Sequence, residues 1–185
     1  MKTIFRNMFK RPLLTISIFF IFCNSQAQFD TSFIKTNIRH CADSLTYGFK
    51  AKKWEVFARY SYPALIGSLG GVKEFITYIS ETFSQIPDTA WKKYEPGKIL
   101  QIIKTGGDYQ TIIELKTKLE WQGSLITTTS HLIGESWDGG RFWTFFDSQG
   151  DVRAAKMIKP DLSDLLIIPN REEIKEPLSI PVKNK

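Results

Sequence analysis

The spacing of apolar residues changes once along the chain, and this change constrains the fold more than any other feature. Between Thr31 and Phe49 they recur at steps of three and four, the spacing of an amphipathic helix. From Lys98 onward the period falls to two, which is typical of a strand with one buried face. Helices followed by strands indicate an α+β domain with the helices on one face of an antiparallel sheet.

Three helices are expected before the first strand. The second begins near Trp54 and is ended by Pro63, and the third runs from Val72 to Pro87 after the pair Gly70-Gly71. The first presents a single apolar stripe, made of Ile34, Ile38, Cys41, Ala42, Leu45 and Phe49.

A meander of four strands is expected next, over 99–104, 109–121, 125–135 and 142–147. In the second of these the odd-numbered residues from Tyr109 to Trp121 should face the core. The opposite face should be wet, with Ile112 as the exception. That wet set comprises Gln110, Glu114, Lys116, Lys118 and Glu120. Val152 to Ile158 is predicted to be helical, and Leu165 to Ile168 an extended piece over an edge of the sheet.

Residues 1–27 have the pattern of an export signal. Four basic residues precede the apolar run Leu13–Phe22, and Ser25-Gln26-Ala27 offers small residues for cleavage near Ala27. Lipidation at Cys23 is the weaker alternative, because Phe22 stands where a small residue is usual. We expect a periplasmic or extracellular protein without a stable membrane anchor after cleavage.

Residues 28–168 are predicted to form one domain, and 169–185, which hold three prolines among charges, a flexible tail. Without the four basic residues of the signal, 21 Lys and Arg stand against 19 Asp and Glu, or +2. This charge gives no reason to expect a nucleic-acid partner. Cys41 is then the remaining cysteine, and with the histidines at 40 and 131 it makes no metal pattern, so no metal or cofactor is expected.

The stretch SWDGGRFW, residues 136–143, has the spacing of the Asp box found in propeller hydrolases. Such hydrolases carry several boxes at a regular repeat, and this chain has one. A structural hairpin turn explains the stretch better: Ser136 and Asp138 accept backbone hydrogen bonds, Gly140 supplies positive φ, and Trp143 packs beneath.

Three segments together resemble a known group: WEVFARYSYP at 54–63, Gly70-Gly71 opening a helix, and DGGRFWTFFD at 138–147. They are similar to exported bacterial proteins of the nuclear transport factor 2-like superfamily, also called the polyketide-cyclase-like or cystatin-like cone. The resemblance implies a curved sheet of four to six strands that forms a cone around a long helix, with a pocket at its wide end. Members include isomerases, dehydratases and binding domains, so the resemblance leaves the function open.

Residue types offer few candidates for chemistry in such a pocket. His131 is the candidate general base of an isomerase or dehydratase, on a strand face shared with Thr129, although no carboxylate obviously pairs with it. Tyr60, Tyr62 and Trp121 are candidate ligand-binding residues at the pocket mouth or rim. Asp147 is expected to hold the turn that follows it.

The aromatic-rich interior with few polar candidates favours a non-catalytic cone that binds a small apolar or amphipathic molecule, or a protein partner. The alternative is the enzyme based on His131. Either a monomer or a homodimer fits the sequence.

Overall fold

The computed structural model describes residues 31–178; the predicted signal peptide and residues 179–185 of the predicted tail lie outside this range. The helices come first: α1 (Thr31–Lys50), α2 (Trp54–Tyr60), α3 (Pro63–Ser68) and α4 (Val72–Thr82), followed by a 3-10 turn at Asp88–Ala90. The strands β1 (Trp91–Thr105), β2 (Asp108–Trp121), β3 (Ser124–Ser136) and β4 (Thr144–Asp147) follow, and α5 (Val152–Ile158) and β5 (Glu172–Pro177) close the order.

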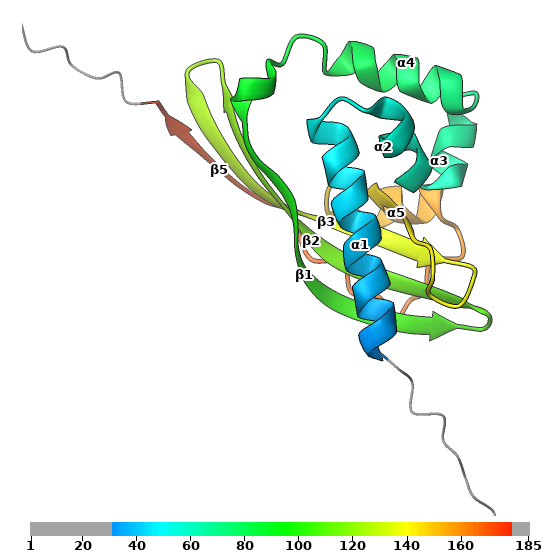
Figure 1. The fold of residues 1–185 in the computed structure, drawn as a ribbon. Coiled ribbons are helices and arrows are strands. Elements are labelled where there is room, and N and C mark those ends of the chain that lie inside the picture. The colour runs from blue at the N-terminus through cyan, green and yellow to red at the C-terminus, as the bar shows by residue number, and fades with distance from the viewer. Residues whose placement is uncertain (1–30, 179–185) are drawn as a thin grey trace, which may run out of the picture.

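The strands form one antiparallel sheet in the order β1-β2-β3-β4. The outer edge of β3 is shared, because β4 pairs with its second half at 132–135 and β5 with its first half at 124–129. The long strands bend around the N-terminal helices (Figure 1). This architecture confirms the predicted α+β class with helices against a curved antiparallel sheet.

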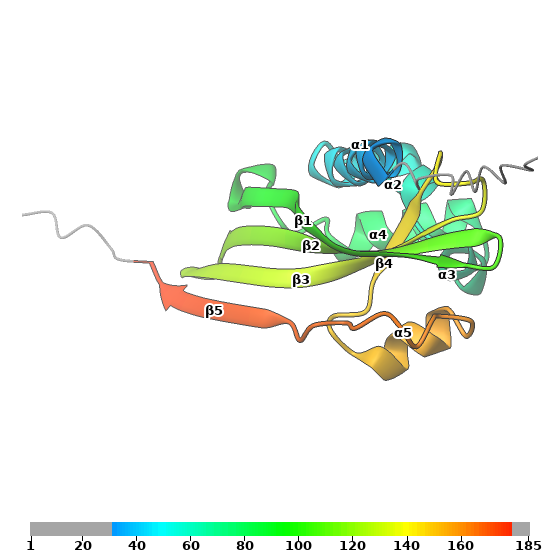
Figure 2. The same cartoon turned by 90° about the horizontal axis from the view of Figure 1, so that it is seen from below.

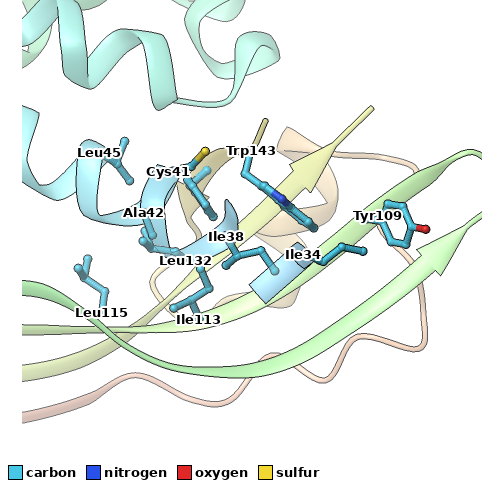
Figure 3. Packing of buried hydrophobic residues seen from close by; sticks show 11 residues of the cluster. Ile34, Ile38, Cys41, Ala42, Leu45, Tyr109, Ile113, Leu115, Leu132 and Trp143 are labelled. Atoms are coloured by element: carbon cyan, nitrogen blue, oxygen red, sulfur yellow. The ribbon is translucent and has the colours of Figure 1, made fainter. Parts of the chain in front are cut away.

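Helix α1 lies on the concave face through its predicted apolar stripe, of which every member is buried. Figure 3 shows the stripe from Ile34 to Leu45 opposite Ile113, Leu115 and Leu132 of the sheet, with Trp143 beside the first turns of the helix. Trp143 is fully buried. Cys41 is a buried member of this core. Each buried Ile, Leu or Phe side chain of the stripe stabilises the fold by about 1.5–3 kcal/mol relative to exposure, so this stripe anchors α1.

The opposite face of the sheet is not uniformly wet, which corrects the expectation for β2. Helix α5 and the segment at 159–168 lie beneath it, away from the other helices (Figure 2). Ile112 packs there with Ile133, Leu162 and Leu166, and Gln110 is 1% exposed. Ile112 interrupts the polar series because that half of the face is core, whereas Lys118 near the far end of the strand is exposed.

Three further boundaries differ from expectation. Pro63 ends one helix and also starts α3 as its first residue, where its missing N–H is harmless. β1 begins at Trp91 and tolerates Pro96 because its pairing with β2 is irregular there. Residues 172–177, predicted to lie in a flexible tail, form β5, an edge strand with all six residues exposed.

Within residues 31–178, no helix has both the length and the apolar character needed to span a bilayer.

Candidate functional site

A cleft of about 430 Å³ opens between the helices and the concave face of the sheet. The end of α1 and residues of α2 and α4 form one wall, and β1, β2 and β3 form the other. A smaller cavity of about 110 Å³ continues inward and shares Phe57, Ile79, Tyr94 and Asp147 with it. The size falls within the ~300–1,000 Å³ usual for small-molecule sites.

Aromatic rings line one end of the cleft. Phe49 stacks on Tyr94 with ring centroids 4.3 Å apart, and it meets Phe83 and Trp91 edge-on at 4.8 Å and 5.2 Å. These contacts hold the rings in fixed orientations. Five more aliphatic and aromatic side chains complete the apolar lining: Phe57, Ile79, Leu115, Leu119 and Ile126. The cleft therefore suits a flat or extended apolar group.

Asp147, the last residue of β4, gives the cleft a polar end. Its Oδ2 accepts a hydrogen bond of 2.7 Å from the Ser130 hydroxyl, and its Oδ1 accepts one of 2.7 Å from the backbone N–H of Gln149. Burial raises the pKa of Asp147 above its usual value, although these hydrogen bonds and the charges of Arg171 and His131 act in the other direction.

Tyr94 places a hydroxyl near this carboxyl group. Burial, reinforced by the charge of Asp147, raises the pKa of Tyr94 far above its usual value. The phenol therefore stays protonated and uncharged at every physiological pH. The cleft thus combines a carboxyl group with neutral hydroxyls from Tyr94 and Ser130, and Thr117 and Thr128 add two more on the sheet.

Arg171 and Glu173 form the outer rim of the polar end, just before and within β5. The Arg171 guanidinium donates to the side chains of Gln149 and Glu173, so its charge is already matched on the rim. The residues that line this end therefore carry two carboxyl groups, those of Asp147 and Glu173, and one cationic group, that of Arg171.

His131 does not line the cleft. β3 contributes Ile126, Thr128 and Ser130 instead, the alternate set of side chains. His131 is paired across the ladder with Glu114 and is 4% exposed, and its Nδ1 is buried without a hydrogen-bond partner among the described residues. The structure thus places His131 and Thr129 in the alternate set of β3 side chains that does not line this cleft.

The other ligand-binding candidates also lie away from the cleft. Tyr60 packs on Phe142 with ring centroids 5.3 Å apart. Tyr62 is 7% exposed and packs on Phe146 beneath the sheet, with the Lys159 ammonium 5.8 Å from its ring centre. Trp121 ends β2 opposite Ser124. The structure does not bring these residues into one site.

The SWDGGRFW stretch forms a turn held by side chains. Asp138 Oδ1 accepts hydrogen bonds from the Ser136 hydroxyl at 2.8 Å and from the N–H groups of Arg141 and Phe142, each at 3.0 Å. Ser136 Oγ in turn accepts from the N–H of Gly140 at 3.0 Å. Trp143 Nε1 donates to the Gly140 carbonyl at 3.1 Å. The side chains of Ser136, Asp138 and Trp143 are thus engaged in the turn itself.

A buried ion pair lies on the other face of the sheet. The side chains of Lys159 and Glu135 are each 1% exposed and in direct contact, and Lys159 also reaches Asp161 at 2.9 Å. Burial lowers the pKa of Lys159, but hydrogen bonds and charge from both carboxylates outweigh it and leave the pKa above its ordinary value. Because both side chains are buried, this ion pair holds the segment that begins at Lys159 against β3 of the sheet.

A signal in the sequence identifies the cleft side of β3. Both alternate sets of β3 mix apolar and hydroxyl residues, so periodicity alone leaves its orientation open. A two-residue turn at 122–123 pairs Trp121 with Ser124 and therefore Leu119 with Ile126. Since Leu119 belongs to the correctly predicted inner face of β2, this register places Ile126, Thr128 and Ser130 on the cleft.

Comparison of the sequence with models of known protein families and with curated proteins found no match to either. Among residues 31–178, no group of three or more His, Cys, Asp or Glu side chains is arranged to hold a metal ion. The class that fold and site define is an α+β domain whose curved antiparallel sheet and N-terminal helices enclose an aromatic cleft with a carboxyl group at one end.

Proposed function

We propose that this protein is an exported cone domain, similar to the nuclear transport factor 2-like superfamily, that binds a small amphipathic molecule without transforming it. The observation that carries the proposal is the 430 Å³ cleft, whose lining is apolar at one end and polar at the other. Export rests on the basic and apolar N-terminal pattern, and the family on the three sequence segments together with a compatible fold.

Binding can be tested with N-phenyl-1-naphthylamine, an uncharged probe whose fluorescence rises in apolar surroundings. The mature chain, residues 28–185, should bind it saturably. Leu119→Trp should weaken this binding at least tenfold, because Leu119 lines the cleft and an indole there fills it.

Leu125→Trp is the matched control. Leu125 and Leu119 are both partly buried, and they lie on adjacent positions of the β2–β3 hairpin, but Leu125 belongs to the alternate set that does not line the cleft. This variant should bind like the parent protein. Equal affinity of all three proteins, or no binding to the parent, would contradict the proposal.

Proton-transfer catalysis of the isomerase or dehydratase type is a second candidate function. Asp147 lines the cleft and burial raises its pKa, which makes it the candidate base, whereas His131 does not line the cleft. Turnover of a ligand identified by binding should then be lost in Asp147→Asn and unaffected in His131→Gln. The reverse result would restore His131 as the base.

A further inference from the structure

The charge balance at the polar end of the cleft points to the chemistry of the ligand, on the premise that the cleft binds one. Asp147 is hydrogen-bonded by Ser130 and Gln149, but it has no ion-pair partner among the described residues. The nearby guanidinium of Arg171 already donates hydrogen bonds to the side chains of Gln149 and Glu173. The charges of Arg171 and His131 act on this partly buried carboxylate, but neither forms a salt bridge with it, so a cation in the cleft would be its direct partner.

Both oxygens of Asp147 already accept a hydrogen bond, and this arrangement suits the ionised form. An ionised carboxylate only accepts hydrogen bonds, so a ligand that binds to the remaining lone pairs of Asp147 must be a hydrogen-bond donor. An ammonium group satisfies them and supplies the missing positive charge. A ligand carboxylate at the same position would be repelled by Asp147 and by Glu173 on the rim.

The aromatic end adds a second, independent reason. Phe49, Trp91 and Tyr94 line the cleft and are packed against one another. The faces of such rings carry negative charge density and attract cations, while their area covers apolar groups. The wall formed by these three rings therefore suits the apolar part of a ligand, whether aliphatic or aromatic, and it also attracts a positive charge.

We infer that the cleft selects small organic amines, with the ammonium group paired to Asp147 and the apolar body against Phe49, Trp91 and Tyr94. The volume of about 430 Å³ accommodates a molecule of roughly one ring and a short alkyl chain.

A matched series tests this inference: 4-phenylbutylamine, 4-phenylbutan-1-ol and 4-phenylbutyrate, which share one body and differ in the head group. Each is used to displace N-phenyl-1-naphthylamine from the mature protein at pH 7. The amine should bind at least tenfold more tightly than the alcohol, and the carboxylate most weakly.

Asp147→Asn keeps the shape and removes the charge. The preference for the amine over the alcohol should fall below about twofold, while the alcohol and the fluorescent probe keep their affinities, which also shows that the variant is folded. Glu172→Gln is the control for the general negative field, since Glu172 is an exposed residue of β5 that does not line the cleft. It should retain most of the preference.

Acidity provides an independent readout. Because Asp147 has a raised pKa, lowering the pH should protonate it and weaken amine binding but not alcohol binding. The groups around it are Ser130 and His131 on β3, Tyr94 on β1, and Arg171 and Glu173 next to and on β5. Glu172→Gln should show the same loss at low pH as the parent protein, and Asp147→Asn should show none.

The outcomes separate the two proposals. If the probe binds at the cleft but the alcohol equals or exceeds the amine, or Asp147→Asn keeps the preference, the amine inference is overturned and binding in the cleft stands. If the probe does not bind, or binds equally to Leu119→Trp, the proposed function fails and the inference falls with it.

Discussion

Asp138 shows how a single side chain defines a turn. Its Oδ1 accepts hydrogen bonds from one hydroxyl and two backbone N–H groups, which hold the loop between β3 and β4 in place. Burial raises its pKa, but hydrogen bonds from Phe142, Ser136 and Arg141 outweigh that effect and leave the pKa below its usual value. The carboxylate form is therefore the one that stabilises the fold.

Replacing this carboxylate should destabilise the protein measurably. For Asp138→Ala we expect the free energy of unfolding at pH 7 to fall by about 1–2 kcal/mol, as for the loss of a side-chain cap. Urea denaturation followed by circular dichroism would measure the change. Asp108→Ala, at the first residue of β2, is the control and should change the free energy of unfolding by less than about 0.5 kcal/mol.

The same variant has a defined pH dependence. The folded-state pKa of Asp138 is lowered, so its contribution is complete above the unfolded-state value of about 3.9 and is lost as the pH falls through the folded pKa. The difference between parent and Asp138→Ala should accordingly shrink at acid pH. A difference that stays constant down to full protonation would show that the charge is not what holds the turn.

At the scale of elements, the segment after α5 is attached to the sheet by one buried ion pair and the apolar contacts around it. Lys159 reaches Glu135 of β3 from the end of α5, and Gln110 of β2 accepts a hydrogen bond of 3.0 Å from the N–H of Ser163. Removing one member of the pair leaves the other charge buried without compensation.

Lys159→Met should lower the free energy of unfolding by about 3–5 kcal/mol, because Glu135 then remains buried and unpaired. Lys156→Met, on the same helix, removes an exposed pair with Asp164 and should cost less than about 1 kcal/mol. The double variant Glu135→Leu with Lys159→Met should recover much of the loss. A double variant as unstable as Lys159→Met would show that the charged pair itself is favourable.

At the scale of the whole molecule, β5 extends the sheet along half of the β3 edge and contributes Glu173 to the rim of the cleft. It covers the first half of the β3 edge and carries Glu173, while Arg171 stands just before it. An uncovered strand edge exposes unpaired N–H and C=O groups and tends to pair with another chain.

A chain ending at Pro169 should therefore self-associate more strongly than one ending at Leu178, which retains β5. Sedimentation velocity over a range of concentrations would compare their average masses. We expect a larger, concentration-dependent mass for the shorter chain. Identical masses at all concentrations would mean that the β3 edge is protected without β5.

Helices and strands could be predicted from the sequence wherever a local pattern of apolar residues marks them. The α1 stripe, the inner face of β2 at Leu115 and the meander all follow from periodicity. α3 was missed because Pro63 both ends and starts a helix, and β5 because charges and prolines obscure an edge strand. The polar end of the cleft was missed because Ser130, Asp147 and Arg171 are far apart in sequence and no shared motif marks them.

The sequence by itself determined the class of fold, because alternating apolar spacing specifies which elements form and that each must bury one face. The tertiary structure decided that the β2–β3 turn has two residues, 122 and 123, rather than the three expected, and this register selects which of the two mixed alternate sets of β3 faces the cleft. It placed Ser130 rather than His131 beside Asp147, and it buried Lys159 against Glu135. These pairings depend on how separate elements pack, which no local pattern encodes.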